Sequence, residues 1–210
     1  ATRISFVNDI AALCEKLHAD VDLVRRGMGS DNRIGPKFLF PGIGYGGSCF
    51  PKDVSALLRQ AERVDVHLQI VDATERINAL QKSVLLEKAR AHFGSLKGKT
   101  VAVWGLAFKP QTDDVREAPA LVLIRGLLAE GAKVQAFDPV AVESFRVALG
   151  PSEVIYATSD YEALPGADAL FLCTEWPEFR RPDFDRIKSL LKTPVVFDGR
   201  NLFDPKLLHG

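Results

Sequence analysis

The second half of the sequence alternates strand-like with helix-like segments, and this alternation limits the possible folds more than any other feature. After residue 94, apolar runs typical of buried strands are separated by segments with helical spacing. Strands joined in this way by helices pair in parallel and form a doubly wound sheet. We therefore predict a Rossmann-like α/β domain with strands at residues 100–108, 132–139, 154–156, 168–174 and 194–200 and helices at 119–130, 141–149 and 184–191.

The first half has the spacing of helices instead. Apolar residues recur every three or four positions from Ile4 to Leu17, and a second short helix follows. Residues 52–93 contain neither glycine nor proline, which predicts a helix there, with a break near residues 65–67 and about 25 residues after it. A helix of that length serves as a domain connector, a dimer interface or an ordinary core helix. We predict a helical central region at residues 1–93 and an α/β domain at residues 94–210.

Composition argues against several classes of partner. Lys plus Arg and Asp plus Glu both total 27, so no net field attracts nucleic acid or an anionic membrane. No apolar run approaches the roughly 20 residues of a membrane-spanning helix, and the first residues lack a signal-peptide pattern. The three cysteines are far apart and have no CxxC spacing, which argues against disulfides and a zinc site. We expect a soluble cytoplasmic protein without a bound metal.

A glycine-rich loop over residues 30–50 ends in GYGGSCFPKD, where Cys49 stands just before a proline-led helix start. The positive end of a helix favours a thiolate, and Lys52 adds a cation one turn away. Cys49 would then be a nucleophile, with Asp53 as a general base. The alternative is a small buried cysteine packed behind the glycines. The histidines lie in no triad signature, so a cysteine hydrolase is not indicated.

Charged residues follow the predicted strand ends, where doubly wound sheets bind ligands: Lys109, Asp138, Glu175 and Arg200. The turn after the first strand, GLAFKP, has one of the three glycines of the dinucleotide-binding GxGxxG turn, so it does not by itself indicate NAD. Lys109 could neutralise a phosphate or be an ordinary solvated lysine. For Asp138 and Glu175 we expect a structural role, in which each caps a strand end.

Residues 31–57, DNRIGPKFLFPGIGYGGSCFPKDVSAL, resemble the active-site loop of the UDP-glucose 6-dehydrogenases within the nucleotide-sugar dehydrogenase family. Three later segments agree with this family in order: GLAFKPQTDDVREAP, CTEWPEF and FDGRN. The resemblance covers the whole chain. It implies oxidation of the primary alcohol of UDP-glucose to a carboxylate with two NAD, in which Cys49 forms a thiohemiacetal and then a thioester, and Asp53 assists the water step.

The resemblance also implies which residues bind ligands. It makes the first region a dimerisation region that carries the cysteine loop, and the second a UDP-sugar-binding domain. Arg33 matches an arginine that reaches across a homodimer into the neighbouring substrate site. The other residues implied to bind substrate are Phe40, Pro41, Gly42, Ile43, Gly44, Tyr45, Gly46, Phe108, Lys109 and Arg200, and those implied to face NAD are Cys49, Phe50, Pro51, Lys52 and Arg116.

The chain opens on Ala1, inside an amphipathic pattern and without an initiator methionine. In the family that it resembles, an NAD-binding domain comes first, so we expect that domain to be absent from this chain and the 210 residues to be inactive alone. Two alternatives stay open. The chain could come from a sister enzyme that oxidises GDP-mannose or an N-acetylated UDP-sugar, or it could be a noncatalytic module that binds a nucleotide sugar and dimerises.

Overall fold

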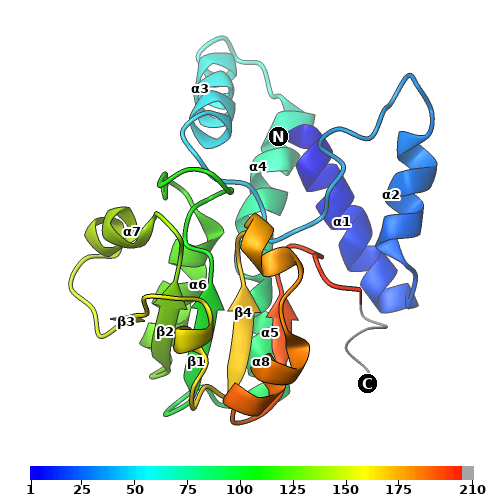
Figure 1. Ribbon diagram of the computed structural model, residues 1–210. Coiled ribbons are helices and arrows are strands. Elements are labelled where there is room, and N and C mark those ends of the chain that lie inside the picture. The colour runs from blue at the N-terminus through cyan, green and yellow to red at the C-terminus, as the bar shows by residue number, and fades with distance from the viewer. Residues whose placement is uncertain (205–210) are drawn as a thin grey trace.

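The computed structural model describes residues 1–204 and shows a helical unit beside a parallel β-sheet (Figure 1). The helical unit comprises α1 (Thr2–Leu17), α2 (Val21–Gly29), α3 (Phe50–Glu62) and α4 (Gln69–Gln81). The sheet contains β1 (Thr100–Trp104), β2 (Lys133–Phe137), β3 (Ile155–Tyr156), β4 (Ala169–Leu172) and β5 (Val196–Asp198). The helices around it are α5 (Val84–Phe93), α6 (Pro119–Ala129), α7 (Val142–Leu149) and α8 (Phe184–Leu190), with 3₁₀ turns at Tyr161–Ala163 and Pro177–Arg180.

The strands are all parallel and lie in the order β3-β2-β1-β4-β5. Val101 of β1, for example, pairs with Val134 of β2 and with Ala169 of β4. Because the chain runs outward from β1 first on one side and then on the other, the strand order reverses between β1 and β4. The predicted doubly wound α/β fold is confirmed. The carboxyl ends of β1 and β4 form the edge where such folds bind ligands.

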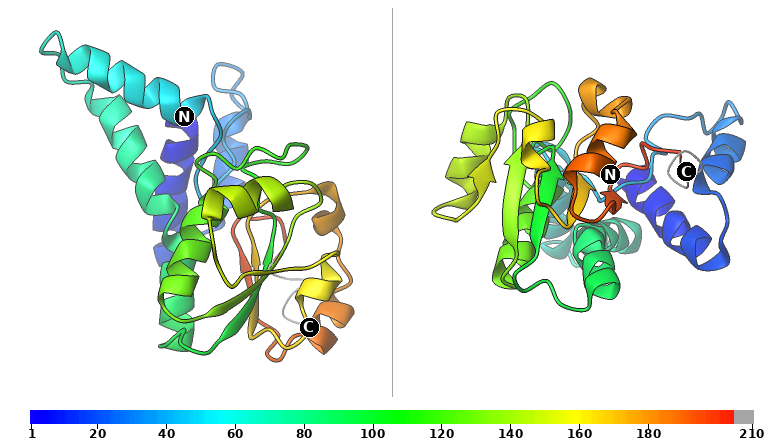
Figure 2. Two further views of the ribbon diagram at one scale, coloured as in Figure 1. Left: turned by 90° about the vertical axis from the view of Figure 1, so that its left-hand side faces the viewer. Right: turned by 60° about the horizontal axis from the view of Figure 1, so that its bottom comes forward.

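Helices cover both faces of the sheet (Figure 2). Val101 and Val103 are fully buried in the core that includes α5 and α6, whereas the alternate residues Ala102 and Trp104 are fully buried in the core that includes α8. Ile124 of α6 is also fully buried, and burying a side chain of this size stabilises the fold by roughly 2 kcal/mol. These two apolar layers fix the sheet and thereby the loops at its carboxyl edge.

Each strand is shorter than the sequence predicts. β1 ends at Trp104 because Gly105 adopts a φ of +89° and lies against Thr174. A Cβ on Gly105 would lie 2.5 Å from Cβ of Thr174, so a larger residue does not fit there. Residues 105–108, predicted as the end of the strand, therefore belong to the loop after β1, beside the ligand edge.

The predicted single helix of about 25 residues after residue 67 is instead two helices, α4 and α5. Ser83 lies at the break, where its backbone N–H and its Oγ both donate to the carbonyl of Leu80, at 3.0 and 2.8 Å. α4 packs against α1, whereas α5 buries its apolar face in the core formed by the sheet and the helices around it, which we call the sheet unit. The domain boundary after residue 93 stays a prediction.

α1 and α4 lie side by side, and Oγ of Ser5 donates to the carbonyl of Thr74 at 2.8 Å. α3 buries only Ala61 and projects from the body together with α4 (Figure 2). The break predicted near residues 65–67 is confirmed between these two helices. None of the helices formed by residues 1–204 is both long enough and apolar enough to cross a membrane.

Candidate active site

A cavity of about 600 Å³ opens at the carboxyl edge of the sheet, beside the point where the strand order reverses. The glycine-rich loop and the loops after β1, β4 and β5 all contribute to its wall. Its volume suits a small-molecule ligand. The lining residues are Ile4, Lys37, Phe38, Phe40, Gly44, Tyr45, Gly46, Gly47, Ser48, Cys49, Phe50, Phe108, Lys109, Glu175 and Arg200.

Side-chain amides of α1 and α4 hold the glycine-rich loop in place of a partner strand. Gly42 donates its N–H to Oδ1 of Asn8 at 2.8 Å, and its carbonyl accepts from Nε2 of Gln81 at 2.7 Å. Tyr45 donates its N–H to Oδ1 of Asn78 at 2.8 Å, and its carbonyl accepts from Nδ2 at 3.1 Å. Backbone groups that are buried in the wall are thereby satisfied. Helical spacing alone did not single out these amides, although they interrupt the apolar faces of two predicted helices.

Two backbone hydrogen bonds join the same loop to the sheet unit. The N–H of Ile43 donates to the carbonyl of Gly199 at 2.9 Å, and the N–H of Gly47 donates to the carbonyl of Arg116 at 2.7 Å. The glycine-rich loop is therefore fastened to the helical unit on one side and to the sheet unit on the other. Its position depends on both units.

Some residues predicted to bind substrate lie outside this cavity. Arg33 is one of them: it does not line the cavity, and its side chain is 89% exposed and pairs with Asp31 at 2.6 Å. Pro41, Gly42 and Ile43 line a separate space of about 410 Å³ on the other side of the loop. The structure gathers Phe40, Gly44, Tyr45, Gly46, Phe108, Lys109 and Arg200 around the main cavity, together with Lys37 and Phe38, which were not predicted.

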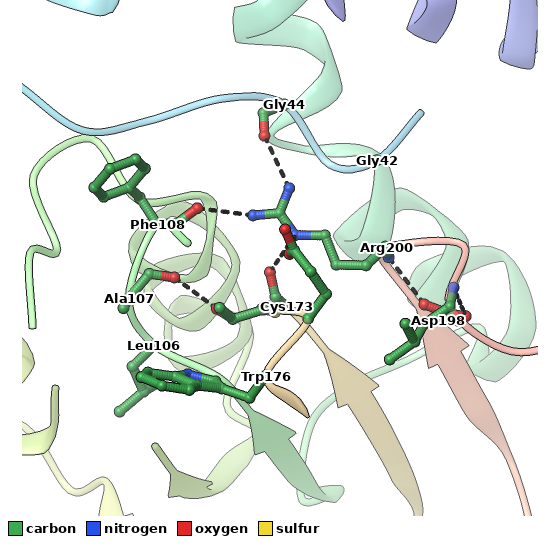
Figure 3. A network of polar contacts seen from close by, with 12 residues as sticks. Gly42, Gly44, Leu106, Ala107, Phe108, Cys173, Trp176, Asp198 and Arg200 are labelled. Atoms are coloured by element: carbon green, nitrogen blue, oxygen red, sulfur yellow. Dashed lines mark hydrogen bonds and ion pairs between the residues drawn. The ribbon is translucent and has the colours of Figure 1, made fainter. Parts of the chain in front are cut away.

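Arg200 binds three segments that meet at the cavity (Figure 3). Its Nε donates to the carbonyl of Cys173 at 2.8 Å, and Nη2 donates to the carbonyl of Phe108 at 2.9 Å. Nη1 lies 3.5 Å from the carbonyl oxygen of Gly44. Oε2 of Glu175 lies 3.0 Å from Nε, so Glu175 pairs with this guanidinium and the predicted strand-end cap is wrong. Only 14% of the Arg200 side chain is exposed, which makes it a clamp between loops.

Asp138 has the structural role that was expected of it. Its buried Oδ2 accepts from the backbone N–H groups of Leu106 and Ala107, at 2.7 and 3.1 Å, and from Nε1 of Trp176 at 3.1 Å. Oδ1 accepts from the N–H groups that follow β2. The carboxylate thus caps the end of β2 and fixes the start of the loop after β1.

Basic side chains outnumber acidic ones around the cavity. Of the described residues, Lys37, Lys109 and Arg200 line it, against the single carboxylate of Glu175. Lys109 is exposed, and its ammonium lies 5.4 Å from the centre of the Phe108 ring. The balance of charge favours an anionic ligand, which lysine can neutralise as a point charge.

Cys49 is the N-cap of α3, and its exposed side chain lines the cavity. Its Sγ lies 3.8 Å from Oγ of Ser48. Gly47 has a φ of +84°, and a Cβ on it would lie 2.7 Å from the ring of Phe108. The alternative of a buried structural cysteine is therefore wrong for Cys49. Cys173, by contrast, is buried, and its burial raises the pKa of that thiol to about 12.

Asp53 lies in the first turn of α3 and does not line the cavity. Its N–H donates to the carbonyl of Cys49 at 2.8 Å, and its carboxylate pairs with Lys52 at 2.5 Å. The hydrogen bond to Asp53 raises the pKa of Lys52. Because the carboxylate is occupied by Lys52, the part that Asp53 is predicted to play in the water step stays a prediction.

A second depression, of about 830 Å³, lies beside the main cavity and shares Gly47 and Ser48 with it. Because these residues directly precede Cys49, the two spaces meet next to the thiol. Of the residues predicted to face the cofactor, this depression gathers Pro51, Lys52 and Arg116, whereas Cys49 and Phe50 line the main cavity.

Arg116 is held in a fixed orientation by Asp114. Its Nε lies 3.0 Å from Oδ1 and its Nη2 lies 2.8 Å from Oδ2. This side-chain hydrogen bond lowers the pKa of Asp114 and raises the pKa of Arg116. A guanidinium oriented in this way at the rim of the depression suits a ligand that carries phosphates.

In the part of the chain that the structure describes, no histidine lines the main cavity. His92 packs against the rings of Phe93 and Phe197, and His67 lies between α3 and α4. His209 lies outside the described residues. A cysteine–histidine pair of the hydrolase type is therefore not formed by the described residues.

Two family models match the chain. Residues 1–80 match the central domain of the UDP-glucose/GDP-mannose dehydrogenase family, and residues 102–205 match its UDP binding domain. A UDP-glucose 6-dehydrogenase of Pseudomonas aeruginosa is 51% identical over 210 residues, which cover 98% of this chain and 46% of that protein. A UDP-glucose 6-dehydrogenase of Bacillus subtilis is 48% identical over 203 residues, which cover 97% of this chain and 44% of that protein. The chain thus spans about half the length of these curated relatives.

Solved structures share the fold. A UDP-glucose dehydrogenase from the archaeon Pyrobaculum islandicum matches with a TM-score of 0.88 at 36% identity, over 96% of this chain and 45% of that one. An NDP-N-acetyl-D-galactosaminuronic acid dehydrogenase from Methanosarcina mazei matches with a TM-score of 0.85 at 27% identity, over 100% of this chain and 46% of that one. With both family models matched in order, the chain belongs to the UDP-glucose/GDP-mannose dehydrogenase family.

Proposed function

We propose that the protein oxidises UDP-glucose to UDP-glucuronate, a four-electron oxidation of the primary alcohol that uses two NAD. The observation that carries this proposal is the cavity at the ends of β1 and β4, where an exposed thiol lies beside basic side chains and glycine backbone. The family membership and the relatives named UDP-glucose 6-dehydrogenase support it. Because the chain covers 46% of the first of these relatives, the activity is proposed for the full-length protein.

The substrate would bind with its diphosphate near Lys109 and Arg200. Lys109 presents an exposed ammonium, whereas Arg200 already donates to carbonyls and would use its remaining N–H groups. The backbone of Gly44, Tyr45 and Gly46 and the rings of Phe40 and Phe108 would line the rest of the nucleotide-sugar site. Pro41, Gly42 and Ile43 face the other side of the loop and would act by setting its position.

Cys49 is the proposed nucleophile. Once the alcohol has been oxidised to an aldehyde, Sγ would add to the aldehyde carbon and hold the sugar as a thiohemiacetal. The second oxidation converts this adduct to a thioester, and water then releases the carboxylate and the thiol. Cys49 lies at the N-terminus of α3 with its side chain exposed, so the thiol is accessible to the sugar. Asp53 would assist the water step after it separates from Lys52.

The residues around the second depression fit a dinucleotide, because Lys52 and Arg116 place two cations beside Gly47 and Ser48, next to the thiol. NAD bound there would supply the hydride acceptor. Cys49, Phe50, Pro51 and Lys52 would face the cofactor from the start of α3, and Arg116 would face it from the loop after β1.

We also propose a homodimer that resides in the cytoplasm. The exposed side chain of Arg33 would reach the substrate cavity of the neighbouring subunit, since it does not line the cavity of its own chain. Cys14, Cys49 and Cys173 are all free thiols, which fits a reducing compartment. The division into a central region and a UDP-sugar-binding domain is proposed to fall after residue 93.

The test of this function is a comparison of substrates with the full-length protein. We expect NADH formation with UDP-glucose at two NADH per sugar, and no sustained turnover in Cys49→Ser. A preference for GDP-mannose or an N-acetylated UDP-sugar would identify a sister enzyme instead. Binding of UDP-glucose without NADH formation would identify a noncatalytic module.

The 210-residue chain provides a second test. Because the substrate cavity is formed within it, we expect it to bind UDP-glucose, and we expect it not to reduce NAD by itself. Isothermal titration and NADH absorbance measure the two properties. NADH formation by these residues alone would contradict the expectation.

A further inference from the structure

The residue that directly follows α4, its C-cap Lys82, is a nearly buried lysine that the proposed chemistry does not use. Only 10% of the Lys82 side chain is exposed, and its Nζ lies 2.8 Å from Oε2 of Glu117, in the loop after β1. A lysine is seldom this buried without a charged partner, because the ammonium loses its hydration. Lys82 therefore ties the helical unit to the loop after β1 through a single ion pair.

The stem of Lys82 lies against the glycine-rich loop. A Cβ on Gly44 would lie 3.4 Å from Cγ of Lys82 and 2.8 Å from Oδ1 of Asn78, which is one turn earlier on the same face of α4. Asn78 in turn holds both backbone groups of Tyr45. Asn78 in the last turn of α4 thus contacts the cavity wall, and the C-cap Lys82 reaches past that wall to Glu117.

Glu117 meets the glycine-rich loop from the opposite side. Its φ is +54°, a left-handed conformation that residues other than glycine seldom adopt, so the surroundings must hold it there. A Cβ on Gly46 would lie 2.4 Å from the carbonyl oxygen of Glu117, and Gly47 donates its N–H to the carbonyl of Arg116 at 2.7 Å. The backbone of Gly46 and Gly47, which leads to Cys49, is therefore packed directly against the backbone of Arg116 and Glu117.

We propose that Lys82 and Glu117 form a positioning pair that fixes the loop after β1 on the glycine-rich loop and thereby sets Cys49 relative to Arg116. Glu117 lines the second depression, and Lys82 lies against Gly44, which lines the main cavity, so the pair links the walls of the two spaces. This inference rests on the proposed function, because that reaction needs the thiol of Cys49 and the cofactor-facing Arg116 in fixed relative positions. Neither side chain of the pair touches the reacting atoms. Loss of the ion pair between Lys82 and Glu117 should therefore lower kcat more than it weakens binding of the sugar nucleotide.

Lys82→Met tests the pair because it keeps the apolar stem and removes the charge. In the full-length protein we expect kcat for UDP-glucose oxidation to fall roughly tenfold, and KM for UDP-glucose to change by less than about twofold. Glu117→Gln should have the same effect, and Lys82→Arg should restore most of kcat. The double variant should be no slower than either single variant, because the two residues act as one unit.

Lys88→Met is the matched control. Lys88 forms a pair of similar length, 2.7 Å, with Glu15 between α5 and α1, and its loss should leave kcat unchanged. The rate at which iodoacetamide labels Cys49 should change in Lys82→Met and stay constant in Lys88→Met, which gives a readout that does not require turnover.

The inference is overturned if Lys82→Met and Glu117→Gln lower the melting temperature but leave kcat and the labelling rate unchanged. Additive losses of kcat in the double variant would also overturn it. If the unmodified full-length protein oxidises no nucleotide sugar, the proposed function fails. The labelling rates of Cys49 then still decide whether the pair positions the thiol.

Discussion

Two stretches of the glycine-rich loop are held in very different ways. Residues 42–47 are mostly buried, and amides from α1 and α4 and carbonyls of the sheet unit hold their backbone. Residues 31–40 are mostly exposed, and Arg3 supplies the side-chain contacts to their carbonyls at Ile34, Gly35 and Lys37. We call residues 42–47 the inner stretch and residues 31–40 the outer stretch. Within the outer stretch, Phe38 has a φ of +63° and a half-exposed ring that lines the cavity.

The difference indicates a division of labour between the two stretches. The inner stretch leads to the thiol, and its backbone is fixed before any ligand arrives, which lowers the cost of ordering the reacting groups. The outer stretch can adjust to a ligand or to a neighbouring subunit, because few contacts oppose its movement. Substitutions should therefore have large effects on folding in the inner stretch and small ones in the outer stretch.

The largest effect should come from Gly46→Ala in the inner stretch. The added Cβ would lie 2.4 Å from the carbonyl oxygen of Glu117, so the two loops must separate. We expect a loss of about 3 kcal/mol in the free energy of unfolding, measured by urea denaturation. Gly27→Ala in α2 is the control, because nothing lies within 4 Å of its added Cβ, and it should gain up to about 1 kcal/mol. Equal stability of the two variants would refute the close packing.

Asn78→Ala should have the next largest effect. It leaves the N–H and the carbonyl of Tyr45 without their partners in a buried site, at a cost of about 2 kcal/mol in unfolding free energy. Arg3→Ala, which removes the contacts to the outer stretch, should cost less than about 1 kcal/mol because those contacts are largely exposed to water. If Arg3→Ala proves the more damaging variant, the outer stretch is the one that is fixed.

Arg33→Ala should separate folding from activity. Among residues 1–204 the Arg33 side chain pairs with Asp31 alone, at the surface, so the free energy of unfolding should not change. If Arg33 serves the neighbouring cavity as proposed, turnover of UDP-glucose by the full-length protein should nevertheless fall at least severalfold, because that cavity loses a cation. Steady-state kinetics measured together with thermal denaturation decide the matter. Unchanged turnover would remove Arg33 from the substrate site.

The smallest effect should be a dependence of stability on acid that arises from Asp114 in the loop after β1. The hydrogen bond from Arg116 lowers the pKa of Asp114 in the folded protein. The stabilisation is therefore complete above the ordinary carboxyl range and is lost as the pH falls through the lowered value. The amides around residues 42–47 do not titrate. Asp114→Asn should accordingly lose less stability than the unmodified chain between about pH 5 and pH 2, as measured by urea denaturation.

Periodicity was sufficient to predict the fold but not its boundaries. The change from helical spacing to alternating strands and helices predicted the doubly wound sheet, because each apolar face must be buried. It did not predict the break between α4 and α5. That break depends on how α5 packs into the sheet core and on the side-chain bond of Ser83, and neither is visible in the spacing of apolar residues.

The candidate site could be predicted only where its residues are close in sequence or match the family. The loop before Cys49 was identified in this way, as were Lys109 and Arg200 at strand ends. Asn8, Asn78 and Lys82 were not identified, because an amide or an ammonium acquires its partner only when distant segments meet. Glu175 was assigned the wrong role for the same reason, since its pairing with Arg200 depends on how β4 and β5 are placed.

Labelling of Cys49 in the presence of its proposed substrate is the most direct test of the sugar-nucleotide site. The 210-residue chain is titrated with UDP-glucose while the rate of iodoacetamide labelling at Cys49 is followed by mass spectrometry. If the ligand occupies the cavity that this thiol lines, labelling slows and reaches a plateau as the site fills. A labelling rate that stays constant at UDP-glucose concentrations that saturate binding would show that the nucleotide sugar binds elsewhere.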